Sequence, residues 1–159
     1  MNTPDLSVTL IGAMTKDRVI GRDDGMPWDI PEEYRTFVET IRGETVIMGR
    51  RSYEIFGGDL TSAHTVVLSR GNPDIAPPVA HGPEDALVLA RSYGKKIFVS
   101  GGAQTYTLFL PLADWMYLSE IKGDYAGDKH FPKFDQSQWE ITREDDHEQF
   151  IYRQWRRLK

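Results

Sequence analysis

The amino-acid sequence predicts an α/β fold in which a mainly parallel sheet is covered by helices on both faces. Through residue 121, short apolar segments rich in Val and Ile alternate with helix-like segments, and the connections between them are short. Beyond residue 121 the sequence has no helix-like segment, and its alternating pattern indicates a hairpin. The first feature predicts parallel strands, and the second adds antiparallel strands at one edge of the sheet.

The chain begins with a strand, a long loop and a helix. The apolar run Ser7–Met14 (SVTLIGAM) predicts a buried strand, and the loop Thr15–Ile30 follows it. Pro31–Arg42 is expected to be helical, because proline is favoured at the first helical position and apolar residues then recur at helical spacing. Thr45–Met48 is expected to be the second strand.

The middle of the chain continues the alternation. Gly49 is expected to begin a short helix that is broken at Gly57–Gly58. Thr65–Ser69 (TVVLS) predicts a third strand. The proline-rich stretch Asn72–Pro83 is then expected to be a surface connection with a short strand at Val79–Ala80.

Glycine and proline delimit the remaining helices. Gly94 is expected to end a helix over Glu84–Tyr93, and Pro111 to end one over Ala103–Leu110. The remaining expected strands are Lys96–Ser100, Trp115–Ile121 and the hairpin pair Trp139–Glu144 and Gln149–Arg156.

Composition predicts a single globular domain. The 159 residues, 40% hydrophobic and 27% charged, suit one domain over residues 1–159, and we expect a monomer. A formal charge of −5 without a basic run argues against a nucleic-acid partner. Zero cysteines exclude disulfides and thiolate metal sites, and we expect no metal. The sequence shows neither a targeting segment nor a membrane-spanning run, so we expect a cytoplasmic protein without a membrane partner.

Two glutamates at the start of the first helix differ in their position around it. A helix advances about 100° per residue, so Glu32 lies opposite the apolar stripe and Glu33 on its flank. Asp29 and Glu32 also have the spacing of a capping box. Only Glu33 is expected to reach a cleft, where burial raises the pKa of a carboxyl toward neutrality, as a general acid requires. The stripe consists of Ile30, Tyr34, Phe37, Val38 and Ile41.

Two strand-to-helix joints have the composition of phosphate-binding loops. In VIMGRRS, Gly49 ends a strand and Arg50–Arg51 begin a helix; in FVSGGAQTY, Gly101 and Gly102 precede a helix. Glycine allows close backbone approach, and free N–H groups with arginines attract anions. Each joint alone is often only a tight turn, but the pair together predicts a phosphate-bearing ligand.

Seven motifs in order resemble dihydrofolate reductases from about Leu6 to Trp155. The resemblance implies a single-domain, three-layer fold whose eight-stranded mixed sheet, mostly parallel, carries about four helices on its two faces. It further implies NADPH as cofactor and 7,8-dihydrofolate as substrate, reduced to 5,6,7,8-tetrahydrofolate by hydride transfer to C6 with protonation of N5. The motifs are IGRDDGMPWDIPEEYRTF, VIMGRRSYE, VVLSR, VSGGAQTY, LFLP, YLSEI and GDKHFP.

The same resemblance implies the catalytic residues. Glu33 falls on the family's active-site carboxylate, which binds the pterin 2-amino group and N3 and supports protonation of N5. Ser119 replaces a threonine whose hydroxyl steadies that carboxylate. Trp28 lies with Met26 and Pro27 on a mobile loop that closes over the site. Together with Glu33, the substrate-binding positions implied are Ala13, Ile20, Tyr34, Phe37, Ser100 and Tyr106.

The resemblance also implies the cofactor site. Arg50 and Arg70, with Ser69 beside them, match positions that hold the adenosine 2′-phosphate, and Arg51 matches one that meets the phosphates. Guanidinium groups suit a phosphomonoester because each offers a planar pair of donors. The other positions implied are Ala13, Ile20, Gly21, Met26, Gly49, Ser52, Gly101, Gly102, Ala103, Gln104, Thr105 and Tyr106.

Three positions depart from the family pattern. Ala63 stands where the family usually has an arginine for the substrate's glutamate tail, so we expect weaker binding of that tail. His64 is expected to point the other way along its strand. Ser100 replaces an apolar residue, and Tyr34 replaces a leucine.

Two other functions share the fold and cofactor. One is an NADPH-dependent pyrimidine reductase of riboflavin synthesis, although the MPW loop and the Pro-Glu-Glu helix start resemble the folate enzymes more. The other is a catalytically silent NADPH-binding domain.

Overall fold

A computed structural model describes residues 7–22 and 25–158 of the chain. Residues 1–6, which contributed to the expectation of no targeting segment, lie outside the described part. Asp23 and Asp24 of the predicted loop and the terminal Lys159 also lie outside it.

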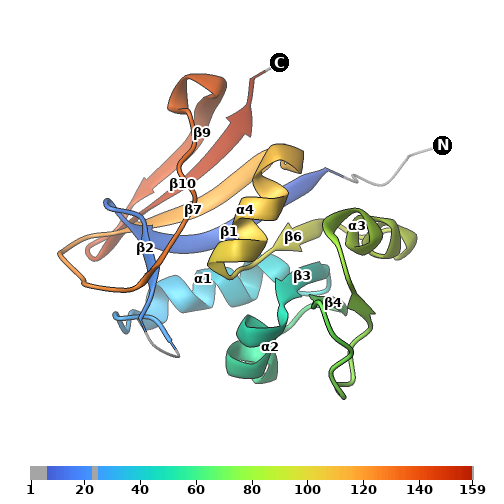
Figure 1. The fold of residues 1–159 in the computed structure, drawn as a ribbon. Helices are drawn as coiled ribbons and strands as arrows, with labels where there is room; N and C mark the ends of the chain where they lie inside the picture. The colour runs from blue at the N-terminus through green and yellow to red at the C-terminus, as the bar shows by residue number, and fades with distance from the viewer. Residues whose placement is uncertain (1–6, 23–24, 159) are drawn as a thin grey trace.

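One eight-stranded sheet forms the centre of the molecule (Figure 1). Its strands lie in the order β5 (Val79–Ala80), β4 (His64–Leu68), β3 (Thr45–Gly49), β6 (Ile97–Val99), β1 (Val8–Thr15), β7 (Trp115–Ile121), β10 (Phe150–Arg157) and β9 (Trp139–Asp146). The first six strands in this order pair in parallel, and β10 is antiparallel to both β7 and β9. The predicted mixed, mostly parallel sheet with an antiparallel C-terminal hairpin is therefore confirmed.

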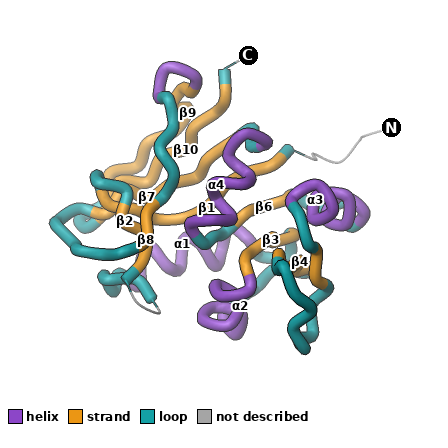
Figure 2. The backbone as a smooth tube through the Cα atoms, viewed as in Figure 1, coloured by secondary structure: helices purple, strands orange, loops and turns teal. Residues whose placement is uncertain are grey.

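Two helices pack against each face of the sheet, as the strand alternation requires. On β1, Val8 and Leu10 join a buried cluster with residues of α3 and α4, whereas Ile11 joins a second cluster with residues of α1 and α2. Successive strand residues point to opposite faces, so the sheet separates the two clusters. The helices are α1 (Pro31–Ile41), α2 (Arg50–Phe56), α3 (Pro83–Ser92) and α4 (Ala103–Phe109), and Figure 2 shows them along the chain.

A small second sheet lies within segments that were expected to be loops. β2 (Val19–Gly21) pairs antiparallel with β8 (Lys129–His130). Gly127 lies so close to this pair that an added Cβ would overlap the carbonyl oxygen of Gly21. The expectation of one long loop over Thr15–Ile30 is therefore wrong in its middle, because tertiary pairing turns a short part of it into a strand.

The start of α1 differs from the predicted capping box. Ile30 occupies the N-cap position, and no side chain caps the helix. Glu32 instead lies 2.8 Å from Nδ1 of His147 in the turn between β9 and β10. Asp29 precedes the N-cap residue, so its side chain is displaced from the position that a capping box needs.

Candidate active site

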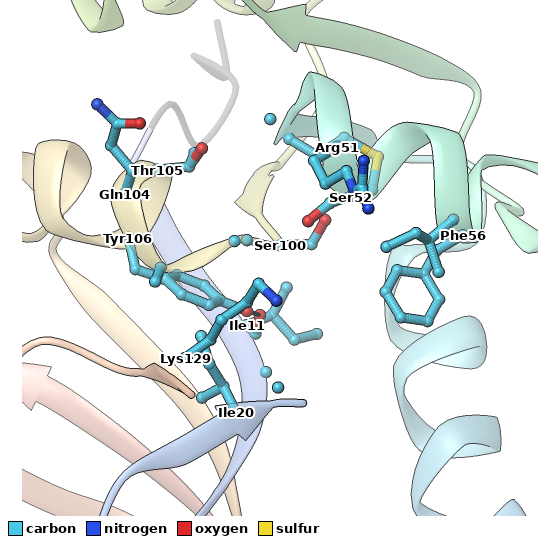
Figure 3. Close-up of a pocket in the computed structure, with 18 of the residues that line it drawn as sticks. Ile11, Ile20, Arg51, Ser52, Phe56, Ser100, Gln104, Thr105, Tyr106 and Lys129 are labelled. Carbon is cyan, nitrogen blue, oxygen red and sulfur yellow. Dashed lines mark hydrogen bonds between the residues drawn. The ribbon is translucent and has the colours of Figure 1, made fainter. Parts of the chain in front are cut away.

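A cleft of about 930 Å³ opens at the carboxyl ends of β1, β3, β4 and β6. Ligands of open α/β sheets bind at this edge. The structure brings nearly all predicted site residues to the wall of this cleft, and Figure 3 labels several of them. They are Ala13, Ile20, Gly21, Met26, Glu33, Tyr34, Phe37, Gly49, Arg50, Arg51, Ser52, Ser69, Arg70, Ser100, Gly101, Gly102, Ala103, Gln104, Thr105, Tyr106 and Ser119.

Glu33 is the buried acid of the cleft. Its side chain is only 7% exposed although it lies in the first turn of α1, whereas Glu32 is exposed. Burial raises the pKa of the Glu33 carboxyl to about 7, and a hydrogen bond from the Ser119 hydroxyl acts in the opposite direction. Ser119 lies on β7 opposite Ala13 of β1, so the sheet fixes the group that orients Glu33. A carboxyl with this pKa can hold or release a proton at neutral pH.

Tyr106 anchors the floor of the cleft. Its hydroxyl donates a 2.7 Å hydrogen bond to the carbonyl oxygen of Ile11. A Cβ on Gly12 would overlap that hydroxyl, so glycine is required there for the ring to reach β1. Burial, and secondly the charge of Glu33, raises the pKa of Tyr106, which keeps its proton. The neighbouring Ser100 hydroxyl, by contrast, is buried and has no partner in the described part of the protein.

The two predicted phosphate loops meet at the other end of the cleft. The backbone N–H of Gly49 donates to the carbonyl oxygen of Gly101 at 2.8 Å, which holds the two strand-to-helix joints side by side. A Cβ on Gly49 would come within 2.8 Å of Thr105 Oγ1, so these joints approach closely because a glycine stands there. Figure 3 shows Arg51 and Ser52 across the cleft from Gln104 and Thr105.

Positive charge is concentrated at this end. Arg50, Arg51 and Arg70 are exposed and line the cleft with Ser52 and Ser69. The Arg50 guanidinium lies 3.6 Å from Glu54, one turn further along α2, an exposed pair worth little. Guanidinium and hydroxyl donors around glycine-lined backbone form a donor set that fits a phosphorylated cofactor.

Aromatic side chains of α1 and α2 form another part of the wall. Tyr34 and Phe37 of α1 face Phe56 of α2, with ring centroids 6.0 Å (Tyr34–Phe37) and 6.5 Å (Tyr34–Phe56) apart. The Tyr34 hydroxyl donates a 2.8 Å hydrogen bond to Oδ2 of Asp59. This part of the wall therefore suits a flat apolar group more than an anion.

Some predicted residues lie elsewhere. Trp28 does not line the cleft; it is 6% exposed and packs with Ile30 and Phe150, so its expected part in catalysis stays a prediction. Ala63 is exposed and also lies outside the cleft wall. His64 stacks on Tyr93 at 3.9 Å, and neither ring lines the cleft.

Lys129 is a cleft residue that sequence reasoning missed. It lies on β8, pairs in register with Gly21, and stands beside Ile20 in Figure 3. A strand of two residues is too short to show alternation, so only the GDKHFP motif could have indicated it.

The described residues contain no group of three or more His, Cys, Asp or Glu side chains placed to hold a metal ion. Within the same residues, no helix combines the length and apolarity needed to cross a membrane.

Comparison with known proteins gives consistent matches. The family model described as dihydrofolate reductase matches residues 7–155. A dihydrofolate reductase of Bacillus subtilis (strain 168) is 35% identical over 85% of this chain and 81% of its own length. The dihydrofolate reductase type A13 of Escherichia coli is 35% identical over 89% of this chain and 87% of its own length. A solved dihydrofolate reductase from Enterococcus faecalis, in complex with NADP(H) and RAB-propyl, superposes with a TM-score of 0.85 at 26% identity, covering 97% of this chain and 98% of that one.

Proposed function

The chain belongs to the dihydrofolate reductase family, and from that membership we propose how its residues carry out the reduction of 7,8-dihydrofolate by NADPH. The protein is an NADPH-dependent oxidoreductase that forms 5,6,7,8-tetrahydrofolate. The pyrimidine reductase and the silent binding domain are not favoured, since the family model and the curated relatives above are dihydrofolate reductases.

The buried Glu33 carboxyl is the observation that carries the proposed mechanism. Its oxygens accept hydrogen bonds from the pterin 2-amino group and N3, and Ser119 holds the carboxyl in place. Because burial brings its pKa to about 7, Glu33 can take up and release a proton near neutral pH, and it supports protonation of N5 through water. Ile20 and Met26 cover the reacting rings, and excluding water there strengthens these polar contacts.

The arginine-bearing end of the cleft holds the cofactor. NADPH, when bound, supplies the hydride that reduces C6 of the pterin. Arg50, Arg70 and Ser69 would hold its 2′-phosphate, and Arg51 would meet the phosphates. Gly101 and Gly102 would let the backbone approach the pyrophosphate closely. The other cofactor-binding residues predicted from the sequence also line the cleft.

Replacement of the two neighbouring glutamates tests this mechanism. Glu33→Gln keeps the shape and removes the ionisable group, so we expect turnover of dihydrofolate at pH 7 to fall by roughly 10² or more while the Kd for NADPH is nearly unchanged. Glu32→Gln is the matched control, because Glu32 is exposed and pairs with His147 away from the cleft. Equal losses in both variants would contradict the assigned role of Glu33.

We further propose that the enzyme acts as a cytoplasmic monomer. One chain supplies both the Glu33 end and the arginine-bearing end of the cleft, so a partner subunit is not needed to complete the site. A cysteine-free chain also suits a reducing compartment. Sedimentation equilibrium of the active enzyme should give a mass near 18.2 kDa, and a dimer mass would contradict the proposal.

A further inference from the structure

Charge is distributed unevenly along the cleft. Among the described residues that line it, the lysines and arginines are Arg50 and Arg51 in the first turn of α2, Arg70 after β4, and Lys129, which lies beside Ile20. The aromatic end is built from Tyr34, Thr36, Phe37, Thr40, Ile55 and Phe56. An anionic group of a ligand would therefore find no lysine or arginine among these side chains.

A carboxylate lies just outside this end: Asp59 is exposed and does not itself line the cleft. Asp59 accepts the 2.8 Å hydrogen bond from Tyr34, whose ring lies in the cleft wall between Phe37 and Phe56. Burial, followed by the bond and the charge of Asp59, raises the pKa of Tyr34, so the phenol keeps its proton and remains a donor. The hydrogen bond fixes the negative charge of Asp59 at the tip of the Tyr34 side chain.

A second contact holds the same segment against α1. The Thr61 hydroxyl donates to the carbonyl oxygen of Val38 at 2.6 Å. Asp59 lies two residues before Thr61, at the end of the short 3-10 turn Gly57–Asp59. The segment is therefore tied to α1 at two points, of which the Tyr34–Asp59 hydrogen bond is one.

The tail of a bound substrate has to pass this carboxylate. With the pterin ring on Glu33 and the cofactor at the arginine-bearing end, the unfilled part of the cleft is the strip between α1 and Phe56. A p-aminobenzoyl group suits the aromatic rings there, but the carboxylates of a glutamate tail would approach Asp59. Like charges repel each other, although solvent screens the exposed Asp59 and keeps the repulsion small; among the described side chains of this end there is no lysine or arginine to offset it.

We propose that Tyr34 and Asp59 determine substrate specificity by disfavouring dihydropterins whose tail carries carboxylates. Dihydrofolate remains the substrate, but its KM is raised relative to that of a dihydropterin with an uncharged side chain or none. This inference rests on the proposed function and refines its substrate preference. It goes beyond the loss of an arginine at Ala63, because it assigns an active repulsion to a residue that is present.

Kinetics with two substrates test the proposal. We compare 7,8-dihydrofolate with 6-methyl-7,8-dihydropterin at saturating NADPH. Asp59→Asn should lower the KM for dihydrofolate by about threefold and leave the KM for the methyl compound and both kcat values unchanged. Asp85→Asn removes the same charge from the exposed first turn of α3 and should change neither KM. Tyr34→Phe keeps the ring and frees Asp59, so it should lower the KM for dihydrofolate by a smaller factor.

Salt dependence of the unmutated enzyme provides a measurement that needs no variant. Screening should lower its KM for dihydrofolate as ionic strength rises, and Asp59→Asn should lose this dependence. A KM for dihydrofolate that responds neither to salt nor to Asp59→Asn overturns the inference, as does an equal change for both substrates. If neither substrate is reduced by NADPH, the proposed function itself fails; if both are reduced without a charge effect, only the specificity inference fails.

Discussion

At the scale of single residues, the burial of Glu33 links catalysis to stability. Its pKa rises from an ordinary 4.5 to about 7 in the folded protein, so between these values the folded state binds more protons than the unfolded state. Stability contributed by this group is therefore fully present below pH 4.5 and is lost as pH rises through 7.

The predicted loss is measurable. From pH 5 to pH 8 the contribution of Glu33 to the free energy of unfolding should fall by about 3 kcal/mol, an order-of-magnitude figure from the size of the pKa shift. Urea unfolding across this pH range gives the free energy of unfolding of the unmutated enzyme and of Glu33→Gln, and the two are compared at each pH. The variant should lack this part of the pH dependence, and parallel curves for the two proteins would refute the assignment.

The buried Ser100 hydroxyl also lowers the stability of the folded protein. It is buried without a partner in the described structure, and a buried unsatisfied polar group costs about 1–3 kcal/mol. Ser100→Ala removes only that oxygen, so we expect the Tm to rise by about 2–4 °C. Differential scanning calorimetry of the ligand-free protein checks this, with Ser62→Ala as a control because the Ser62 hydroxyl lies 3.2 Å from that of Thr65. An unchanged or lower Tm for Ser100→Ala would mean that the hydroxyl is satisfied.

At the scale of elements, the sequence predicts long segments well and short ones poorly. Trp115–Ile121 has its predicted bounds, and α1 ends one residue earlier than predicted. β2 and β8 were missed, because two or three residues cannot show a period and their pairing depends on contacts between distant segments. For the site, helix phase correctly predicts the burial of Glu33, but the position of Trp28 depends on tertiary packing that periodicity does not contain.

The small sheet of β2 and β8 should tolerate no side chain at Gly127. A Cβ there would overlap the Gly21 carbonyl oxygen and would lie 2.5 Å from Val19 Cγ1. Gly127→Ala should therefore separate the two strands, displace Lys129 and Ile20, and destabilise the protein by about 1–3 kcal/mol. Gly58→Ala is the control, since a Cβ there has no atom within 4 Å. Chemical denaturation gives the free energy of unfolding of both variants, and steady-state kinetics give their KM values. If Gly127→Ala has the stability and KM of the unmutated enzyme, Gly127 does not lie as close to Gly21 as described.

At the scale of the whole molecule, a net negative protein concentrates arginines at one end of its cleft. The formal charge is −5, yet Arg50, Arg51 and Arg70 all line the cofactor end of the cleft. Long-range attraction cannot bring a polyanionic cofactor to such a protein from every side, so its binding has to depend on these local groups. The acidic substrate end further orients the cofactor, because the phosphates are favoured only near the arginines.

The arrangement predicts cofactor choice. Charge-assisted hydrogen bonds contribute about 1.5–3 kcal/mol each, so loss of the 2′-phosphate should lower kcat/KM at least tenfold, and NADPH should be preferred to NADH by that factor. Arg50→Ala combined with Arg70→Ala should remove most of the preference by weakening NADPH while leaving NADH nearly unchanged. Arg91→Ala, on the exposed surface of α3, removes one positive charge outside the cleft and should preserve the preference. Steady-state kinetics give kcat/KM for each cofactor and hence the preference. Equal use of NADPH and NADH by the unmutated enzyme would show that the arginines do not bind the 2′-phosphate.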